Sequence, residues 1–258
     1  MRPRKANEYL FSRRHPFDKS CLAFTCWDLL AVAIVLALLA CVALPLMASP
    51  KLHNQRAVCA SNLRQIGRAL QLWGNDHGDQ TPWATEFSDG GMRNPPANSP
   101  LILIHNNAYV YYNWISNELV TAQPLACPAD SAKRPATDFS RLPGVGLNNP
   151  AFLNNAVSYF IGLHASSDYP QSVLCGDRNL KYASIGACSL GPTAAANIPF
   201  VAVSGSAVAW LDSPSIHGET GNLLLYDGRV EPLSNRGVST YYYNLGDDNG
   251  SAHLILSP

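Results

Sequence analysis

The chain has one long apolar run near its N-terminus. Residues Leu29 to Ala48 are 20 consecutive residues without a charged side chain. An α-helix rises about 1.5 Å per residue, so this run would extend roughly 30 Å, the thickness of the hydrocarbon core of a bilayer. We therefore predict a membrane-spanning helix. The alternative is a secretory signal peptide, whose apolar core is usually only about 7–15 residues long.

A different hydrophobic pattern follows this run. Apolar residues recur at spacings of four, three, four and three, the period of one face of an α-helix. They are Cys59, Leu63, Ile66, Leu70 and Trp73. The residues assigned to the polar face are Asn62, Arg64, Gln65, Arg68 and Gln71. The two patterns together predict one helix of about 50 residues from Phe24 to near Asp76, with Gly78 placed to cap its end.

From Thr81 onward, short apolar runs alternate with stretches rich in Pro, Gly and Asn. The segments "AVSYFIGLH" and "PFVAVSGSAVAWLD" are typical of strands. The segment "GNLLLYDGRVEPL" predicts a hairpin that pairs Asn222–Tyr226 with Arg229–Leu233 across Asp227-Gly228, a dipeptide that favours a type I′ turn. Residues 89–100 and 129–150 are expected to be irregular.

A short helix is expected in "YVYYNWISNELV", with Tyr112, Ile115 and Leu119 on one face. The predicted fold class is therefore α+β. It consists of a long N-terminal helix, membrane-spanning in its first half, packed against an antiparallel β-sheet head with long loops.

The formal net charge is zero, but the charges are unevenly distributed. The first 23 residues hold six basic and two acidic side chains, a net of +4, and the remainder has a net of −4. Basic residues before an apolar run predict a cytoplasmic N-terminus and an exported body. A mildly acidic body without a basic stripe argues against nucleic acid as a partner.

Export gives a meaning to the cysteines of the body, because disulfides persist in oxidising compartments. Twelve residues separate Cys175 from Cys188, so we expect these two to pair across a loop. Cys59 and Cys127 would then tie the helix to the head. Four cysteines permit three connectivities, and the sequence does not exclude the other two.

The N-terminal segment "AFTCWDLLAVAIVLALLACVALPLMAS" resembles the signal of type IV pilins and type II secretion pseudopilins. In that family a basic leader is followed by Gly or Ala and then Phe, with an acid at the fifth mature position and often a proline near the twenty-second. Counted from Phe24, Asp28 is the fifth residue and Pro45 the twenty-second. The chain departs from the common pattern in having Ala23 rather than Gly, and Asp rather than Glu.

Four further segments are similar to elements of bacterial pilin-like proteins. "CASNLRQIGRALQLWGNDHGDQTPW" is similar to their amphipathic helix, "CPAD" at 127–130 to a CPSD element, and "VSYFIGL" and "LCGDRNL" also have counterparts. His217, followed by nine residues and then Asp227-Gly228, fits the H-X9-DG element that gives the subfamily its descriptive name. The resemblance extends from Phe24 to about Leu233.

The resemblance implies a structural subunit rather than an enzyme. A prepilin peptidase would cleave between Ala23 and Phe24, the new N-terminus would be N-methylated, and the helix would assemble into a pilus or a secretion pseudopilus. The implied partners are copies of the chain or other pilin-like subunits, the peptidase, an inner-membrane assembly platform and the lipid bilayer. The implied location is the bacterial inner membrane, single-pass, and then a periplasmic or extracellular filament.

The same resemblance divides the chain into a leader at 1–23, a membrane half of the helix at 24–48, an amphipathic half at 49–77 and a head at 78–258. Asp28 would pair with the new α-amino group of a neighbouring subunit, since an unpaired carboxylate near hydrocarbon is costly. The alternative is an acid solvated at the membrane surface. Pro45 would loosen the helix during assembly, or would merely kink it.

Two other functions stay open at the level of sequence. An anchored adhesin would use the aromatic residues Trp83, Tyr109–Tyr112 and Trp114. An anchored hydrolase would use His217 and Asp227 with Ser213 or Ser215, but the G-x-S-x-G nucleophile pattern is absent from the sequence. We therefore expect a structural hydrogen bond for His217.

No cofactor is expected apart from a weak calcium candidate near the C-terminus. Its oxygen ligands would come from Asp247, Asp248 and Asn249. Their spacing does not fit an EF-hand loop, so a solvated turn is the preferred explanation.

Overall fold

The computed structural model describes residues 26–48, 50–104, 107–181, 201–203, 208–211, 216–244 and 253–256. The chain divides into two compact units, Met1–Ala48 and Ser49–Pro258. The described part of the first unit is helix α1 (Cys26–Ala48), which has Asp28 in its first turn and Pro45 within its length. The second unit begins with helix α2 (Pro50–Asn75). Pro50 suits the first position of a helix, where its missing N–H leaves no hydrogen bond unmade.

The prediction of a membrane-spanning first half is wrong. A membrane span needs about 20 predominantly apolar residues in one helix. Within the part of the chain that the structure describes, no helix is long and apolar enough to cross a membrane.

The amphipathic pattern of α2 is confirmed. Its five predicted apolar positions, from Cys59 to Trp73, are all buried. The side chain of Asn62, assigned to the polar face, is also buried, because it lies three residues from Cys59 on the same side of the helix. Gly78 has a φ of +65°, the conformation expected after a helix end.

The second unit contains a six-stranded sheet in which all neighbouring strands are antiparallel, as predicted. The strand order is β4-β8-β1-β2-β6-β7. The strands are β1 (Tyr159–Gly162), β2 (Val173–Asp177), β4 (Val201–Val203), β6 (Thr220–Leu225), β7 (Val230–Ser234) and β8 (His253–Leu256). Strands β3 (Leu180–Lys181) and β5 (Ala209–Trp210) form a separate antiparallel pair.

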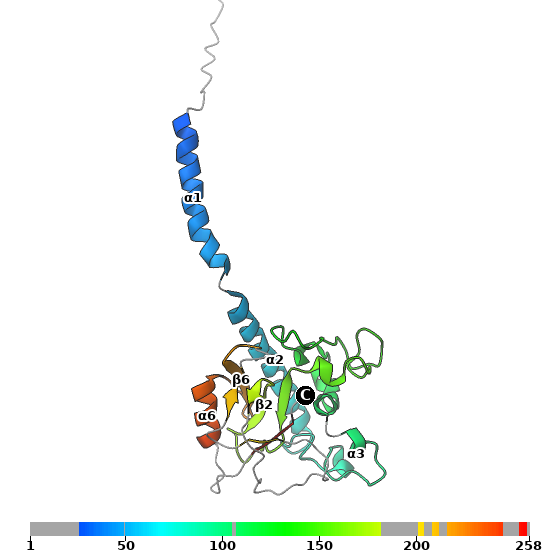
Figure 1. Cartoon of the computed structure of the whole chain (residues 1–258). Coiled ribbons are helices and arrows are strands. Elements are labelled where there is room, and N and C mark those ends of the chain that lie inside the picture. Colours follow the sequence, from blue (N-terminus) through cyan, green and yellow to red (C-terminus); the bar gives the residue numbers. More distant parts are fainter. Residues whose placement is uncertain are drawn as a thin grey trace, which may run out of the picture. The chain divides into compact units, whose positions relative to one another are not determined.

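Helices cover the two faces of this sheet. Helix α2 packs on β2, β6 and β7, while α6 (Asn235–Asn244) packs on β5 and β7 (Figure 1). Side chains alternate along β6, so Leu224 joins the cluster under α2 and Leu223 and Leu225 join the opposite cluster. A Cβ at Gly67 would lie 3.0 Å from the Leu224 side chain, which explains why α2 carries glycine where it crosses β6.

The predicted hairpin is confirmed, with register from Thr220↔Ser234 to Leu224↔Val230. A type I′ turn requires a positive φ at both central residues. Gly228 has a φ of +84°, but the φ of Asp227 is not positive, so the turn is of another type. Gly228 donates its N–H to the Leu225 carbonyl, and Leu225 donates to the Arg229 carbonyl. This pattern is a type I turn with a glycine bulge.

The remaining described elements are short. They are η1 (Phe87–Asp89), α3 (Leu101–Ile104), α4 (Ala108–Trp114), α5 (Ser116–Leu119), η2 (Gln123–Leu125) and η3 (Leu153–Ala156). The helix expected at 109–120 is present as α4 and α5. Its predicted apolar residues, Tyr112, Ile115 and Leu119, belong to the core.

The packing of α2 can be tested with two matched truncations. Leu63 is completely buried, whereas Leu72 on the same helix is 54% exposed. Leu63→Ala should lower the free energy of unfolding by about 2–5 kcal/mol, because it leaves a cavity beneath the helix. Leu72→Ala should change it by less than about 0.5 kcal/mol. Urea unfolding with the disulfide intact measures both, and equal losses would contradict this packing.

Candidate functional site

A disulfide joins helix α2 to the loop that follows η2. Cys59 and Cys127 form this bond, with their Cα atoms 5.2 Å apart and a sequence separation of 68. The predicted tie between helix and head is therefore confirmed. Cys175 instead has a free, buried thiol on β2, which contradicts its predicted bond with Cys188. Burial raises the pKa of the Cys175 thiol to about 12, so this thiol is unreactive at neutral pH.

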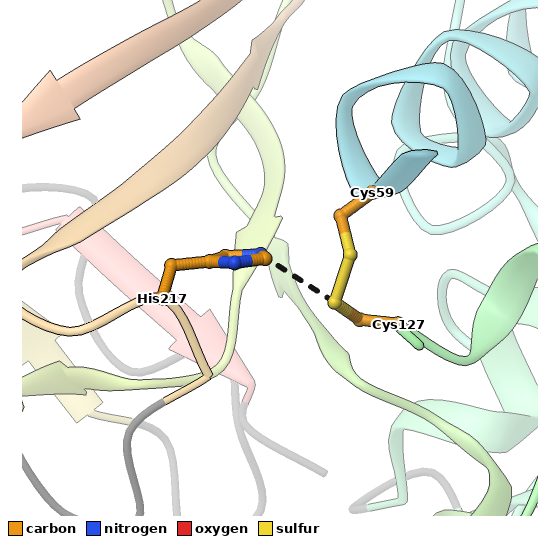
Figure 2. A group of neighbouring side chains, drawn as sticks. All are labelled: Cys59, Cys127 and His217. Atoms are coloured by element: carbon orange, nitrogen blue, oxygen red, sulfur yellow. Dashed lines mark hydrogen bonds between the residues drawn. A yellow bond between two sulfur atoms is a disulfide. The ribbon is translucent and has the colours of Figure 1, made fainter. Parts of the chain in front are cut away.

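His217 lies against this disulfide. Its Nε2 atom is 3.4 Å from the Cys127 sulfur, and the ring points toward that sulfur from the segment that precedes β6 (Figure 2). The Thr220 hydroxyl donates a 2.7 Å hydrogen bond to the His217 carbonyl and so anchors this segment to the start of the strand. The His217 side chain is only 1% exposed.

Asp177, the last residue of β2, lies near the same ring nitrogen of His217. Its Oδ2 atom is 3.6 Å from His217 Nε2. The same oxygen accepts hydrogen bonds from the Asn222 backbone N–H at 2.7 Å and from the Asn222 amide at 2.9 Å. Among the described residues, Oδ1 of Asp177 and Nδ1 of His217 have no hydrogen-bond partner.

The next residue, Arg178, makes a two-pronged ion pair with Asp130. Its Nε and Nη2 atoms donate to the two Asp130 oxygens at 2.7 and 2.8 Å. The Asp130 carboxylate is 1% exposed, so this geometry compensates for its loss of water. The Asp130 N–H donates to the Cys127 carbonyl, which ties the ion pair to the disulfide loop.

Asn62 completes the contact from the helix side. Its amide donates to the Ala126 carbonyl at 3.1 Å and to the Tyr159 hydroxyl at 3.4 Å. The segments "CASNL", "CPAD", "VSYFIGL", "LCGDRNL" and the histidine of H-X9-DG therefore meet in one buried place. We call this the motif cluster: Cys59, Asn62, Cys127, Asp130, Tyr159, Asp177, Arg178 and His217.

Asp227 and Gly228, the other end of H-X9-DG, lie outside the motif cluster. The exposed Asp227 carboxylate accepts a 2.7 Å hydrogen bond from Arg229 at the hairpin turn. Tyr226, next to it, donates its hydroxyl hydrogen to the Asp79 carbonyl beyond the end of α2. The two ends of the element thus lie in two different places. The hydrogen bond of the His217 ring is with the Cys127 sulfur, and the nearby carboxylate, at 3.6 Å, is that of Asp177 rather than Asp227.

Burial shifts the two central groups toward their uncharged forms. It raises the pKa of the Asp177 carboxyl from 3.8 to about 7, against the hydrogen bonds from Asn222 and the charge of Arg56. It lowers the pKa of His217 from 6.5 to about 4, and Arg56 adds to that effect. At neutral pH the imidazole is therefore uncharged.

This burial bears on the two alternatives left open by the sequence. A hydrolase needs its histidine to reach a substrate, and the His217 side chain is almost completely enclosed. Aromatic side chains offered for an adhesin surface pack in or against the core instead: Trp83, Tyr109, Tyr111, Tyr112 and Trp114. Neither alternative gains support from these positions.

One set of atoms in the cluster has the chemistry of metal ligands. The sulfurs of Cys59 and Cys127 and a ring nitrogen of His217 all lie within 4.8 Å of one another. Sequence spacing does not reveal this set, because the three residues are far apart in the chain and fit no local metal-binding motif. The other predicted site residues lie outside the described residues, namely Ala23, Phe24, Cys188, Ser213, Ser215, Asp247, Asp248 and Asn249.

A scan against protein-family models and searches of curated proteins and of solved structures find no match to this chain.

The opposite pKa shifts predict opposite effects of pH on stability. Folded Asp177 keeps a proton that the unfolded chain releases between about pH 4 and 7, so its contribution falls as pH rises. Unfolded His217 takes up a proton between about pH 4 and 6.5 that the folded protein does not, so its contribution rises with pH. The two effects oppose each other in the wild type.

Two variants separate these effects. Relative to wild type, His217→Gln should make the free energy of unfolding fall as pH rises through this range, by up to about 1.4 kcal/mol per pH unit. Asp177→Asn should make it rise. Urea unfolding across the range, with the disulfide intact, measures both slopes, and three parallel curves would contradict the assignment.

Proposed function

We propose that the chain is a structural pilin-like subunit, which assembles through its N-terminal helix into a filament of the type IV pilus or type II secretion pseudopilus kind. The observation that carries the proposal is the exposed apolar surface of α1. Large apolar side chains along this helix are 51–78% exposed: Trp27, Leu29, Leu30, Val32, Ile34, Val35, Leu36, Leu38 and Leu39. A contiguous apolar surface of this kind marks an interaction site.

Identical helices of other subunits are the partner that suits this surface best. They bring the same uncharged surface, and their packing removes apolar side chains from water, at about 25 cal/mol for each Å² buried. The second unit is already supplied with its own core, since both faces of its sheet are covered. A second unit with its own core, together with a helix that exposes apolar side chains, is the combination that a filament subunit needs.

Asp28 would fix the axial position of each helix relative to its neighbours in the filament. It is an acidic residue in the first turn of an otherwise apolar helix. A carboxylate buried among packed helices is costly unless a positive group pairs with it. Cleavage between Ala23 and Phe24 by a prepilin peptidase would create a positively charged α-amino group. Asp28 of a neighbouring subunit would form an ion pair with it. N-methylation keeps that nitrogen positively charged.

The Cys59–Cys127 disulfide supports a location for the head. Disulfides persist in oxidising compartments and are rare in the reducing cytosol. We therefore place the filament in the periplasm or outside the cell, with assembly by an inner-membrane platform.

Substitution of Asp28 tests the proposal in cells that carry the peptidase and assembly platform. Asp28→Ala should abolish filaments, because leaving one partner of a buried pair alone costs about 3–5 kcal/mol at each contact. Asp28→Glu keeps the charge and should preserve assembly. Asp76→Ala removes an exposed acid just after α2 and serves as the matched control. Electron microscopy and quantification of sheared filaments give the readout.

N-terminal sequencing of the same material provides a separate check. A mature chain that starts at Phe24 agrees with the proposal. A chain that retains Met1 and stays monomeric, or normal filaments from Asp28→Ala, would refute it.

A further inference from the structure

The disulfide and His217 have the geometry of a metal site whose two sulfurs have been oxidised. Cys59 comes from α2, Cys127 from the loop after η2, and His217 from the segment before β6 (Figure 2). Three separate segments therefore direct one ligand atom each to a common point. Cys59 is 0% and Cys127 2% exposed, so the point is shielded from water.

The distances fit a tetrahedral zinc ion. Zinc binds thiolate sulfur at about 2.3 Å and imidazole nitrogen at about 2.0–2.1 Å, which places these two ligand atoms about 3.5 Å apart. The Cys127 sulfur and His217 Nε2 are 3.4 Å apart. Two thiolates on one zinc ion are about 3.8 Å apart. Rotation of the cysteine side chains can supply that separation once the sulfur–sulfur bond is reduced.

Asp177 offers an oxygen beside His217 that could serve as a fourth ligand. Its Oδ2 atom is 3.6 Å from His217 Nε2, close to the roughly 3.4 Å expected between a carboxylate oxygen and an imidazole nitrogen on one zinc ion. The carboxylate is completely buried, and its Oδ1 atom has no hydrogen-bond partner among the described residues. A buried acceptor without a donor is costly unless a cation or a donor satisfies it.

The charges of the site also suit a divalent ion. Two thiolates and the Asp177 carboxylate would carry three negative charges. Arg56 acts electrostatically on both Asp177 and His217 and donates to the Gly221 carbonyl at 3.3 Å. One zinc ion together with Arg56 would balance the three negative charges, as a buried site requires.

We propose that the reduced protein binds one zinc ion through Cys59, Cys127 and His217, with Asp177 at the fourth position. Oxidation of the two thiolates to the disulfide releases the ion. This proposal concerns the head and is independent of filament assembly.

The redox step is a thiol–disulfide exchange. A dithiol reductant gives two electrons to the Cys59–Cys127 bond and becomes a disulfide itself, leaving two cysteine thiols. Zinc then displaces the two thiol protons, which pass to solvent. In the reverse direction an external disulfide accepts two electrons from the bound thiolates, the protein disulfide forms again and zinc leaves.

Cobalt is a suitable probe, because tetrahedral cobalt with thiolate ligands absorbs visible light and shows a thiolate charge-transfer band in the near ultraviolet. The full chain in detergent is reduced anaerobically with a phosphine, freed of reductant and titrated with Co²⁺. We expect one Co²⁺ per chain, both absorption features, and their loss when Zn²⁺ is added. The oxidised protein should show neither feature.

Two variants test whether Co²⁺ binds at the proposed ligands. His217→Gln should weaken Co²⁺ binding at least about tenfold. Cys175→Ala removes another buried thiol of the same chain and should leave the spectrum unchanged. Absence of the charge-transfer band in reduced wild type, or equal Co²⁺ binding by His217→Gln, would overturn the proposal.

Reduction can also loosen the fold, and a second measurement covers that case. Zn²⁺ should raise the Tm of the reduced wild type, and restore its near-ultraviolet circular dichroism if reduction has removed it. It should do neither for the reduced His217→Gln variant or for oxidised wild type. Reduced wild type whose Tm and circular dichroism do not respond to Zn²⁺ would overturn the proposal.

Discussion

The head of this protein depends on the covalent link between helix α2 and the loop at Cys127. The bond closes 68 positions of sequence and brings the Asp130 turn against the helix. Asp130 in turn holds Arg178 at the end of β2 with two short hydrogen bonds. The disulfide therefore joins α2 to the loop, and the Asp130–Arg178 ion pair joins the loop to the sheet. The apolar stripe of α2 needs this arrangement, because it can be buried only when the sheet lies beneath it.

The motif cluster shows how a core can hold several polar groups. Burial favours the uncharged forms of His217 and Asp177, while the Asp130–Arg178 pair keeps its charges by compensating them. Two atoms, Asp177 Oδ1 and His217 Nδ1, are left without hydrogen-bond partners among the described residues. Such atoms are few in native proteins and usually have a reason. Zinc binding by the reduced protein, as proposed above, would be such a reason for the Asp177 carboxylate.

The two units of the chain differ in what they leave exposed. The described part of the second unit has apolar clusters on both sides of its sheet. Helix α1 instead exposes most of its large apolar side chains, with an acid in its first turn. The second unit has its own buried core, whereas the described large apolar side chains of α1 are exposed. This difference is the observation on which the proposed assembly through α1 rests.

Local sequence patterns correctly predicted the elements that are determined by residues close together in the chain. The helical period of Cys59 to Trp73 and the hairpin around Asp227-Gly228 are both present, since each depends on residues within one element. The predicted membrane span and the predicted type I′ turn were wrong, and helix α6 was not predicted. Asp227-Gly228 permits more than one turn, and α6 owes its place to packing on β5 and β7.

Only the tertiary structure decided which cysteines pair and what His217 contacts. Nearness along the chain favoured a bond between Cys175 and Cys188, but β2 directs the Cys175 side chain into the core. His217 meets Cys127 across 90 positions, and Arg178 meets Asp130 across 48. No periodicity encodes such separations, because they follow from the order of strands in the sheet and the crossing of α2 over it.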